Sequence, residues 1–566
     1  MRRFIRVFWQ FILSKGDSTY LVLAFFGGSA TFGSSNKTKE TMSSKLLYAF
    51  LLVMTIYAPA GAQVPGSLDL SFDHDGIKIT PIGTANAFGR SMVVQPDGRI
   101  IVACIASNGT NPDFVIARFT TDGELDTSLD GDGIVMTDFD EMSEIADAIA
   151  LDEFNRIIVG GYIDHGLGFG FAVTRYLSDG TLDETFGDSG LVTKMIGKTG
   201  FCKSLAVQKD NKIVLGGYVL DPISNTNEFM LMRFNTDGTP DSTFHEDGIV
   251  QTNTGIGAAV ANAILIQPDK KIVLAGQVLN NATLRWQIGI ARYNEDGSID
   301  DTWDQDGLVF TGLDQADFTI NAVLMDANKK IVVGGYFGTA PSTNLFAVAR
   351  YHLDGRLDET FGDEGIQLGS FGDQGNEVNT LAIQPDGQIL IAGTSLQGNR
   401  DKFAIARLDP DGAFDDSFGE QGVVRPVIEQ NDGINAMALQ QDGKLVVAGE
   451  SFNGQRFSIA VARIETGLTT RVVDPTPSVI NISIVPNPIV ENFTLSYQLK
   501  QSGPVQIALY DVSGSMINVF SDKVFQASGE YQEGFEIPEG ISAGLYWLVV
   551  NAGEQAKATK VIVSRG

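Results

Sequence analysis

The segment Gly66-Ser-Leu-Asp69-Leu-Ser-Phe72, followed by Gly76, is the first of seven copies of one phrase in this chain. The other six copies begin at Gly123, Gly180, Gly238, Gly297, Gly355 and Gly412. Successive copies are 57 to 59 residues apart, which is too long a period for a coiled coil or a leucine-rich array. A fixed period of this kind indicates one supersecondary unit repeated in series, with each copy packing on its neighbours.

Each repeat contains four strand-like runs separated by turn dipeptides. In the fifth repeat the runs are 307–311, 319–324, 330–334 and 345–350. Asp-Gly pairs such as Asp97-Gly98 and Asp122-Gly123 close the hairpins, because glycine and aspartate tolerate the positive φ angles of tight turns. Four strands in each of seven units predict an all-β fold, a seven-bladed β-propeller of four-stranded blades. Paired small residues end the third run of most repeats, and we expect them to let neighbouring sheets approach closely.

An arginine precedes the phrase's aspartate by eight residues in six copies, which predicts an ion pair across each Asp-Gly turn. The expected pairs are Arg118 with Asp126, Arg175 with Asp183, Arg233 with Asp241, Arg292 with Asp300, Arg350 with Asp358 and Arg407 with Asp415. Asp69 lacks such an arginine and Arg463 lacks such an aspartate. We therefore expect Asp69 to meet Arg463, with the N-terminal strand completing the last blade and closing the ring.

The repeated residues also have two functional interpretations, as alternatives to a structural role. The arginines could line a central channel and bind an anion, but their fixed spacing favours the structural pairs. The patterns 71–76 and 128–133 approach the spacing of a calcium loop, but the twelfth position is apolar in both, and Asp138 and Asp140 flank the second one out of register. We expect Asx turns there and no cofactor, with calcium as the alternative.

The composition excludes several classes of function. A formal charge of −29 argues against binding to nucleic acid, which requires basic patches. Four histidines leave little material for a histidine-ligated metal centre or a histidine-based catalyst, and no G-x-S-x-G, H-E-x-x-H or Walker motif is present. Cys104 and Cys202 fall in non-adjacent repeats, so we expect no disulfide between them.

The N-terminus has the pattern of an export signal. Residues 42–62 combine Lys45, an apolar run of about a dozen residues and an Ala60-Gly61-Ala62 site, which predicts a signal peptide cleaved between Ala62 and Gln63. The run is too short for a comfortable membrane span. Residues 1–41 are interpreted as a mis-assigned or disordered leader, with an N-terminal anchor as the alternative.

The repeat pattern spans 63–465 and then stops. Residues 466–480 form a Pro/Thr-rich linker, and 481–566 alternate apolar and polar residues in short runs. This last segment is predicted to be a small Ig-like β-sandwich.

The repeat core LD-x-[ST]-F-x-x-x-G, with Q-P-D-G and F-x-x-A-R-Y, resembles the delta-60 repeats of secreted bacterial proteins. The C-terminal elements Val485-Pro486-Asn487-Pro488, 509–514, Gly544-Leu545-Tyr546 and 560–563 resemble the sorting domain of the type IX secretion system. The resemblance implies passage through the periplasm, contact with the type IX machinery, and a secreted or cell-surface protein with no stable transmembrane span when mature. It supplies no catalytic residue.

Recognition is expected in the loops that differ between repeats, because variable loops on a rigid scaffold commonly carry binding sites. Trp286, at the end of one such loop, is the candidate binding residue. The sequence favours a non-enzymatic scaffold that binds an extracellular glycan or protein. The alternative is a hydrolase or lyase acting on extracellular polysaccharide, which would require non-repeating acids or tyrosines at one mouth of the channel.

Overall fold

The computed structural model describes residues 64–468 and 479–565, apart from 108, 140–141, 167, 373, 500–502, 512–515 and 553–554. Nearer the N-terminus it describes two strands, β1 (Gln10–Ser14) and β2 (Thr19–Leu23), which pair in antiparallel fashion. The predicted signal peptide, the cleavage site at Ala62 and Gln63, and most of the predicted linker lie outside the described residues.

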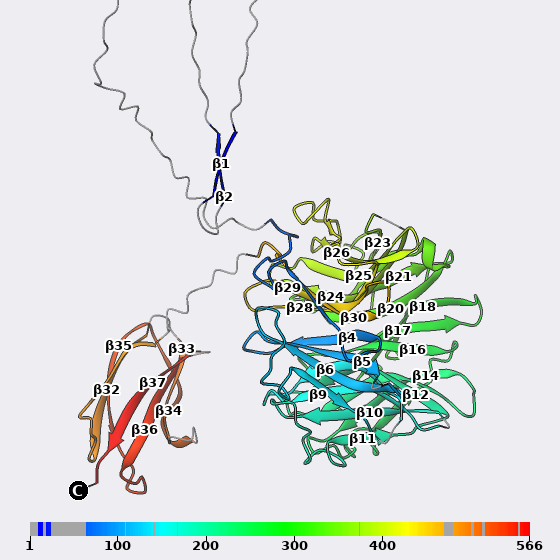
Figure 1. Ribbon diagram of the computed structural model, residues 1–566. Helices are drawn as coiled ribbons and strands as arrows, with labels where there is room; N and C mark the ends of the chain where they lie inside the picture. The colour runs from blue at the N-terminus through cyan, green and yellow to red at the C-terminus, as the bar shows by residue number, and fades with distance from the viewer. Residues whose placement is uncertain are drawn as a thin grey trace, which may run out of the picture. The chain divides into compact units, whose positions relative to one another are not determined.

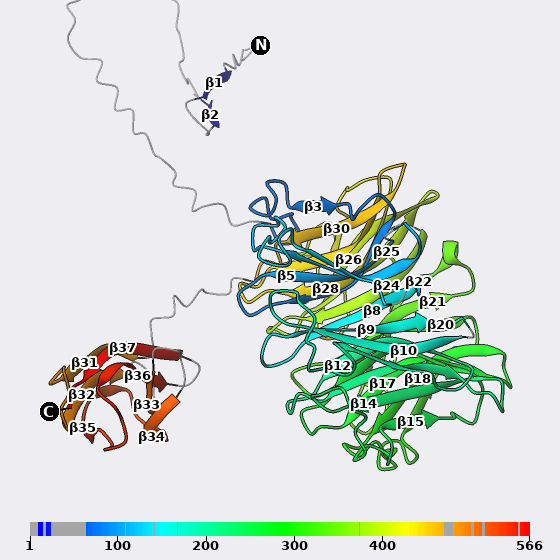
Figure 2. The same cartoon turned by 60° about the horizontal axis from the view of Figure 1, so that its bottom comes forward.

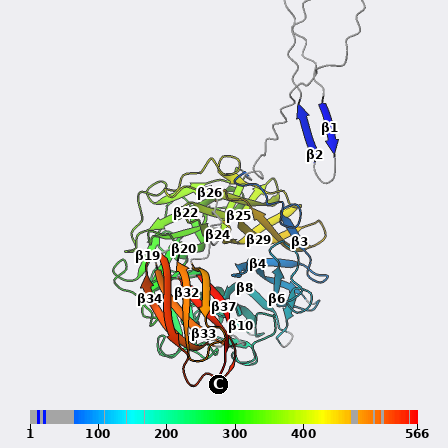
Figure 3. The ribbon, with the colours of Figure 1, turned by 90° about the vertical axis from the view of Figure 1, so that its left-hand side faces the viewer.

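Seven four-stranded antiparallel sheets form the blades of a propeller, and Figure 3 shows them around a central axis. The innermost strands are β4 (Ala87–Val94), β8 (Glu144–Leu151), β12 (Thr199–Val207), β16 (Ala259–Ile266), β20 (Asp317–Met325), β24 (Gln374–Ile383) and β28 (Asn431–Leu439). The second strands are β5 (Ile100–Ser107), β9 (Ile157–Asp164), β13 (Ile213–Leu220), β17 (Ile272–Asn280), β21 (Ile331–Gly338), β25 (Ile389–Gln397) and β29 (Leu445–Phe452).

The outer half of each blade follows the same order (Figure 1). The third strands are β6 (Pro112–Phe119), β10 (Phe169–Tyr176), β14 (Asn227–Phe234), β18 (Arg285–Tyr293), β22 (Leu345–Tyr351), β26 (Arg400–Leu408) and β30 (Phe457–Ile464). The outermost strands are β7 (Ile134–Thr137), β11 (Leu191–Lys194), β15 (Ile249–Thr252), β19 (Leu308–Thr311), β23 (Ile366–Gly369), β27 (Val423–Val424) and β3 (Ile77–Thr80). The described residues contain one short 3₁₀ helix, η1 (Pro341–Thr343).

The C-terminal segment forms two antiparallel sheets. One contains β31 (Val479–Val485), β32 (Asn492–Leu499) and β35 (Gly529–Glu536), and the other contains β34 (Met516–Gln526), β33 (Gly503–Tyr510), β36 (Gly544–Ala552) and β37 (Gln555–Val563). A single apolar cluster combines residues of both sheets. Asn487 of the predicted Val-Pro-Asn-Pro element donates to the Lys560 carbonyl at 3.0 Å and accepts from the Ile562 amide at 2.9 Å. The two most distant sorting elements are therefore adjacent in space.

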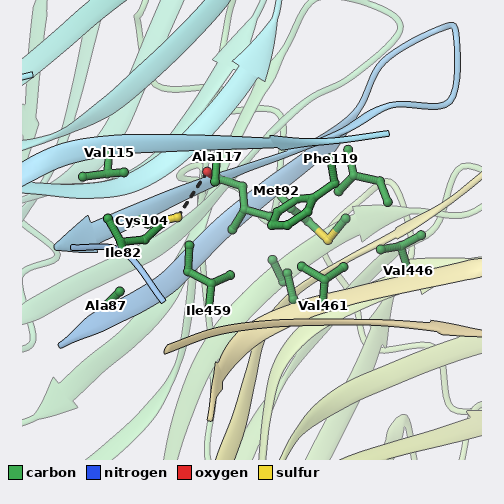
Figure 4. Close-up of a cluster of buried hydrophobic side chains, with 14 of the residues drawn as sticks. Ile82, Ala87, Met92, Cys104, Val115, Ala117, Phe119, Val446, Ile459 and Val461 are labelled. Atoms are coloured by element: carbon green, nitrogen blue, oxygen red, sulfur yellow. Dashed lines mark hydrogen bonds between the residues drawn. The ribbon is translucent and has the colours of Figure 1, made fainter. Parts of the chain in front are cut away.

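Apolar packing joins the blades to one another. Alternation along each strand places one apolar face against each neighbouring blade, and seven buried clusters result, one between each pair of neighbours in the described propeller. Figure 4 shows the cluster between the first and seventh blades, where Met92 and Val115 pack with Val446 and Val461. A side chain such as Val461 contributes about 2 kcal/mol when fully buried.

Cys104 belongs to this same cluster, whereas Cys202 lies between the second and third blades. Both thiols are fully buried and free, and burial raises the pKa of each well above its usual range. They act as small apolar side chains in separate interfaces.

The structure brings each arginine of the repeat against its aspartate. Arg118 Nε donates to Asp126 at 2.6 Å, its Nη2 donates to Ser128 at 2.9 Å, and its Nη1 reaches the Ser178 carbonyl in the next blade. The other blades repeat the ion pair at 2.6–2.8 Å. In six blades the guanidinium also lies 4.4–5.2 Å from the aromatic residue of the phrase. The aspartate and the aromatic residue therefore recur because both contact one buried arginine.

The N-terminal strand supplies the outer edge of the seventh blade. Strand β3 pairs with β30 from Ile77 opposite Ala462 to Thr80 opposite Ile459, and the two lie side by side in Figure 2. Arg463 Nε donates to Asp69 at 2.6 Å, and its Nη1 reaches the Thr121 carbonyl of the first blade. The unmatched residues of the first and last repeats thus meet each other.

Replacing the aspartate of one pair should destabilise the propeller strongly. Asp69→Asn and Asp300→Asn should each lower the free energy of unfolding by about 3–5 kcal/mol, because each leaves a buried arginine without its carboxylate. Urea denaturation measures the change. The matched control is Asp97→Asn, a half-exposed side chain that should cost less than about 1 kcal/mol. Equal stability of Asp69→Asn and the control would contradict a structural role for the Asp69–Arg463 pair.

The same ion pairs predict that the propeller loses stability at acid pH. Burial alone would raise the pKa of Asp300, but hydrogen bonds from Thr302 and Lys271 and the charge of Arg292 outweigh it and hold that pKa at about 2, below the ordinary 3.8. A lowered pKa contributes stability that is present above 3.8 and is lost as the pH falls towards 2. The free energy of unfolding, measured by thermal denaturation between pH 5 and about 2, should therefore fall steeply in the wild type. In Asp300→Asn it should fall by about 2 kcal/mol less. Parallel curves for the two proteins would contradict this assignment.

Candidate functional site: the bulged ring of the central channel

The two ends of the propeller differ in character. The Asp-Gly turns and the arginine pairs lie at one end, which we call the turn end. The loops joining the second and third strands, which differ between repeats, lie at the other, the loop end. None of the repeated arginines is among the residues that line the central cavity, and all seven are buried. They occupy the third strands and not the channel, so the channel-lining alternative is wrong.

Every innermost strand carries a β-bulge. The pairing between the innermost and second strands skips one residue in each blade, as between Ala146 and Ala148 in β8. An unpaired bulge residue bends the strand and redirects its side chain. The seven bulge residues all line one cavity of about 450 Å³; they are Arg90, Asp147, Lys203, Asn262, Asn321, Asn379 and Asn435.

A glycine lies opposite the bulge in six blades, and Cys104 lies there in the first. A Cβ on Gly161 would lie 1.9 Å from the Ile145 carbonyl oxygen of the bulged strand, and Gly217, Gly276, Gly335, Gly393 and Gly449 show the same conflict at 1.8–2.0 Å. The first glycine of the pair has a different role, since a Cβ on Gly160 would meet Leu205 of the next blade. We predicted from the sequence that both residues of the pair allow neighbouring sheets to approach closely. This prediction therefore holds only for the first residue. The second is needed within its own blade.

Four asparagines of the ring link successive blades. Each donates its amide to the carbonyl that precedes the bulge of the next blade: Asn262 to Ile320 at 2.8 Å, Asn321 to Val378 at 3.0 Å, Asn379 to Ile434 at 2.9 Å and Asn435 to Gly89 at 2.8 Å. These bonds satisfy carbonyls that the bulges leave without strand partners. Four of the seven ring residues thus form a neutral hydrogen-bond relay.

The other three bulge residues are charged. Arg90 donates to one oxygen of Asp147 at 3.2 Å, and Lys203 donates to the other at 2.6 Å. Asp147 is 5% exposed, whereas Arg90 is 37% and Lys203 22% exposed. Two accessible cations sharing one buried carboxylate leave a local excess of positive charge in a chain with a formal charge of −29.

Aromatic residues adjoin these charges towards the loop end. Lys203 Nζ lies 5.1 Å from the centre of the Tyr162 ring. Tyr162 contacts Phe169 and Phe201, and Phe201 contacts Tyr218, with ring centres 5.0–5.4 Å apart. Burial and the charge of Asp147 raise the pKa of Tyr162 to about 12, so its hydroxyl stays neutral. All four rings are half-buried and form a partly accessible apolar surface.

Glu450 occupies the position in the seventh blade that Tyr162 occupies in the second, one residue after the bulge-facing glycine. Asn435 donates to it at 2.5 Å. Burial raises the pKa of Glu450 to about 7, against the opposing charge of Arg90 and the bond from Asn435. This carboxyl group can therefore change its protonation state near neutral pH.

Trp286 lies in strand β18 and is half-buried, so it is not an exposed loop residue. Its amide donates to Asp317 at 3.0 Å. The exposed apolar residues of the variable loops are instead Ile223, which is 93% exposed, and Leu284, which is 73% exposed.

The bulged ring was not predicted from the sequence. Its signal was available in part, because asparagine recurs at equivalent positions in the last four repeats. A second missed feature is the basic residue after the hairpin turn, such as Lys271, which binds Asp300 at 2.9 Å beside Arg292. The Asx turns expected at the acidic loops are present, with Asp75 accepting the Ile77 amide at 2.9 Å and Asp132 accepting that of Ile134 at 2.9 Å.

These features define a β-propeller built of seven repeats. The chain belongs to the family described as "Domain of unknown function (DUF5122) beta-propeller", which matches seven segments: 95–129, 155–186, 208–244, 267–302, 327–361, 384–418 and 440–469. Residues 483–564 match the secretion system C-terminal sorting domain. This domain directs the chain to export through the type IX machinery, to the cell surface or the medium.

No curated protein sequence matches the chain. Solved structures similar to it include PorZ, a surface component of the type IX secretion system of Porphyromonas gingivalis, at 13% identity and a TM-score of 0.36. The match covers 84% of this chain and 59% of PorZ. A fungal alcohol oxidase with copper matches at 13% identity and a TM-score of 0.39, over 86% of this chain and 98% of the oxidase. An ulvan lyase matches at 11% identity and a TM-score of 0.40, over 69% and 94%. None of these similarities carries an argument about function.

Within the described part of the chain, no helix has the length and apolar character that a membrane crossing requires.

The asparagine relay predicts a measurable loss of stability. Asn321→Ala removes the bond to the Val378 carbonyl and should lower the free energy of unfolding by about 1–3 kcal/mol, because that buried carbonyl then lacks its donor. Urea denaturation measures the change. Asn328→Ala, an exposed residue of the turn between β20 and β21, is the control and should change stability by less than about 0.5 kcal/mol. Equal effects would show that the relay does not stabilise the ring.

Proposed function

We propose that this protein is an extracellular binding protein whose site is the loop end of the channel in the first three blades. The observation that carries the proposal is the convergence of Arg90 and Lys203 with the aromatic surface of Tyr162, Phe201 and Tyr218. The repeats themselves are structural. The bulge positions and the residues beside them are where the blades differ chemically.

The chemistry of this surface favours an anionic glycan. Aromatic faces stack on the apolar faces of sugar rings, and a guanidinium and an ammonium bind carboxylate or sulfate groups. Arg90 and Lys203 are held in place by Asp147 but keep exposed donors. The exposed loop residues Ile223 and Leu284 would extend the contact at the rim.

The enzymatic alternative is supported by one group. Glu450, with a pKa of about 7, is poised to give or take a proton near neutral pH, as a general acid or base must. It lies beside Asn435 at the same end of the channel. Asp401 and Asp432 also adjoin Glu450, and their charges help to raise its pKa, so a second acid is available to this alternative. We retain binding without turnover as the proposal, because it rests on the convergence of Arg90 and Lys203 with the aromatic surface.

Three further features complete the proposal. The propeller is closed by exchange of the N-terminal strand, which the β3–β30 pairing and the Asp69–Arg463 bond support. The C-terminal sandwich is Ig-like, which its two facing antiparallel sheets support. The chain reaches the surface through the periplasm, with the sorting domain as the part that contacts the export machinery.

The test is an array of neutral, carboxylated and sulfated polysaccharides, probed with the purified full-length chain. Binding should be confined to acidic glycans and should weaken as salt rises. Arg90→Gln and Lys203→Gln should each weaken binding about tenfold or more, because each removes a charge-assisted contact worth about 1.5–3 kcal/mol. Lys209→Gln, an exposed lysine of the turn end, is the control and should bind like the wild type.

Product analysis of each bound glycan separates binding from turnover. Intact glycan after long incubation supports the proposal. Shortened or unsaturated products that disappear in Glu450→Gln would replace it with the enzymatic alternative. Binding that is unchanged in both Arg90→Gln and Lys203→Gln would place the site elsewhere.

A further inference from the structure

Three carboxylates meet between the first and second blades, away from the channel. Asp113 lies in β6, Asp138 directly follows β7, and Glu144 begins β8. One oxygen of each lies within 4.8 Å of the others. Asp113 and Glu144 are fully buried, whereas Asp138 is exposed, so the cluster is open to solvent on one side.

Glu144 has no cation beside it among the described residues. Neither of its carboxylate oxygens has a hydrogen-bond partner, although the side chain is 0% exposed. Burial and the charges of Asp113 and Asp138 raise the pKa of Glu144 to about 8, against weaker opposing interactions with the backbone amides of Phe139 and Glu144. Asn111, two residues before Asp113, is also buried with both amide atoms unpartnered. Unpaired polar groups rarely remain buried in native proteins, so this end of β6 is incomplete as it stands.

The sixth and seventh blades show what the corresponding positions contain elsewhere. Lys402 precedes Arg407 by five residues, as Asp113 precedes Arg118, and Asp432 precedes its bulge residue by three, as Glu144 does. Lys402 Nζ binds Asp432 at 2.9 Å. A buried acid is therefore neutralised by a cation from the neighbouring blade. Between the first and second blades both positions are acidic, so neither can supply the other with a cation.

A buried acid at the same position in the third blade is also satisfied. Glu228, which corresponds to Asp113, accepts from Gln251 at 2.7 Å and from Asn253 at 2.5 Å. The acidic cluster is thus not a general property of the repeat.

We propose that Asp113, Asp138 and Glu144 bind one calcium ion that joins the first and second blades. Two oxygens on one Ca²⁺, each at 2.3–2.6 Å, can be at most about 5 Å apart, which the cluster satisfies. Ca²⁺ prefers carboxylate, carbonyl and water oxygens, and the open side at Asp138 admits the waters that complete its shell. An exported protein meets millimolar calcium, which suffices for the Kd of about 10⁻⁴–10⁻³ M typical of extracellular modules.

This site differs from the acidic loops considered in the sequence. The loop aspartates accept backbone amides in Asx turns. Asp138, which flanks the second loop, belongs to the new cluster. The other two carboxylates of that cluster come from two other strands, one of them in the next blade.

Calorimetric titration of the purified, EDTA-treated full-length chain with CaCl₂ tests the proposal. We expect one Ca²⁺ per chain, with a Kd of about 10⁻⁴–10⁻³ M. The Tm should be higher in about 10 mM CaCl₂ than in EDTA by roughly 3 °C. MgCl₂ at the same concentration should give a smaller shift, because Mg²⁺ demands tighter octahedral geometry.

Two variants with opposite expected results make the test specific. Glu144→Gln should abolish the calcium heat and the calcium-dependent rise in Tm, while its Tm in EDTA should equal or exceed that of the wild type, because one of three crowded charges is removed. Glu228→Gln, the satisfied acid of the third blade, should keep the full calcium response. No calcium heat in the wild type, an unchanged response in Glu144→Gln, or an equal shift with Mg²⁺ would overturn the assignment.

Discussion

The buried arginine of each blade is the contact on which the propeller depends. Its Nε binds the aspartate of its own blade, its Nη1 binds a turn carbonyl of the next blade, and in six blades its face rests on the aromatic residue of the phrase. One side chain therefore closes a turn within a blade and fixes the next blade beside it. Because a buried guanidinium must satisfy all its donors, neighbouring turns have little freedom to change.

That constraint separates the structural end of the propeller from the end that can vary. The turn end repeats the arginine and its aspartate in every blade. At the other end, the bulge of each innermost strand lies opposite a glycine in six blades, as at Gly161 and Gly449, and opposite Cys104 in the first, while the bulge residue itself differs between blades. Four blades place asparagine there and three place Arg90, Asp147 and Lys203. Chemical variation at this end is thus concentrated in the bulge residues, of which the asparagines link blades and the other three are charged.

Much of the fold was predictable, because it follows from residues close together in the chain. The eight-residue spacing of Arg292 and Asp300 spans a single turn, so local geometry brings them together. The bulged ring was not predictable in the same way, since a bulge appears only as a missing partner in strand pairing. The prediction that Trp286 is an exposed loop residue was wrong for a related reason: strand β18 extends further towards the loop than its apolar pattern indicated.

The sequence by itself determined the number of blades, their four-strand plan, the arginine pairs and the export signal at the C-terminus, because each is a local pattern repeated or placed at a fixed position. The tertiary structure alone decided which residues face the channel and which acids meet between blades. Asp147 joins Arg90 and Lys203 from three blades, and Asp113 meets Glu144 across an interface. Such contacts depend on how the blades are oriented around the axis, and no spacing along the chain encodes that orientation.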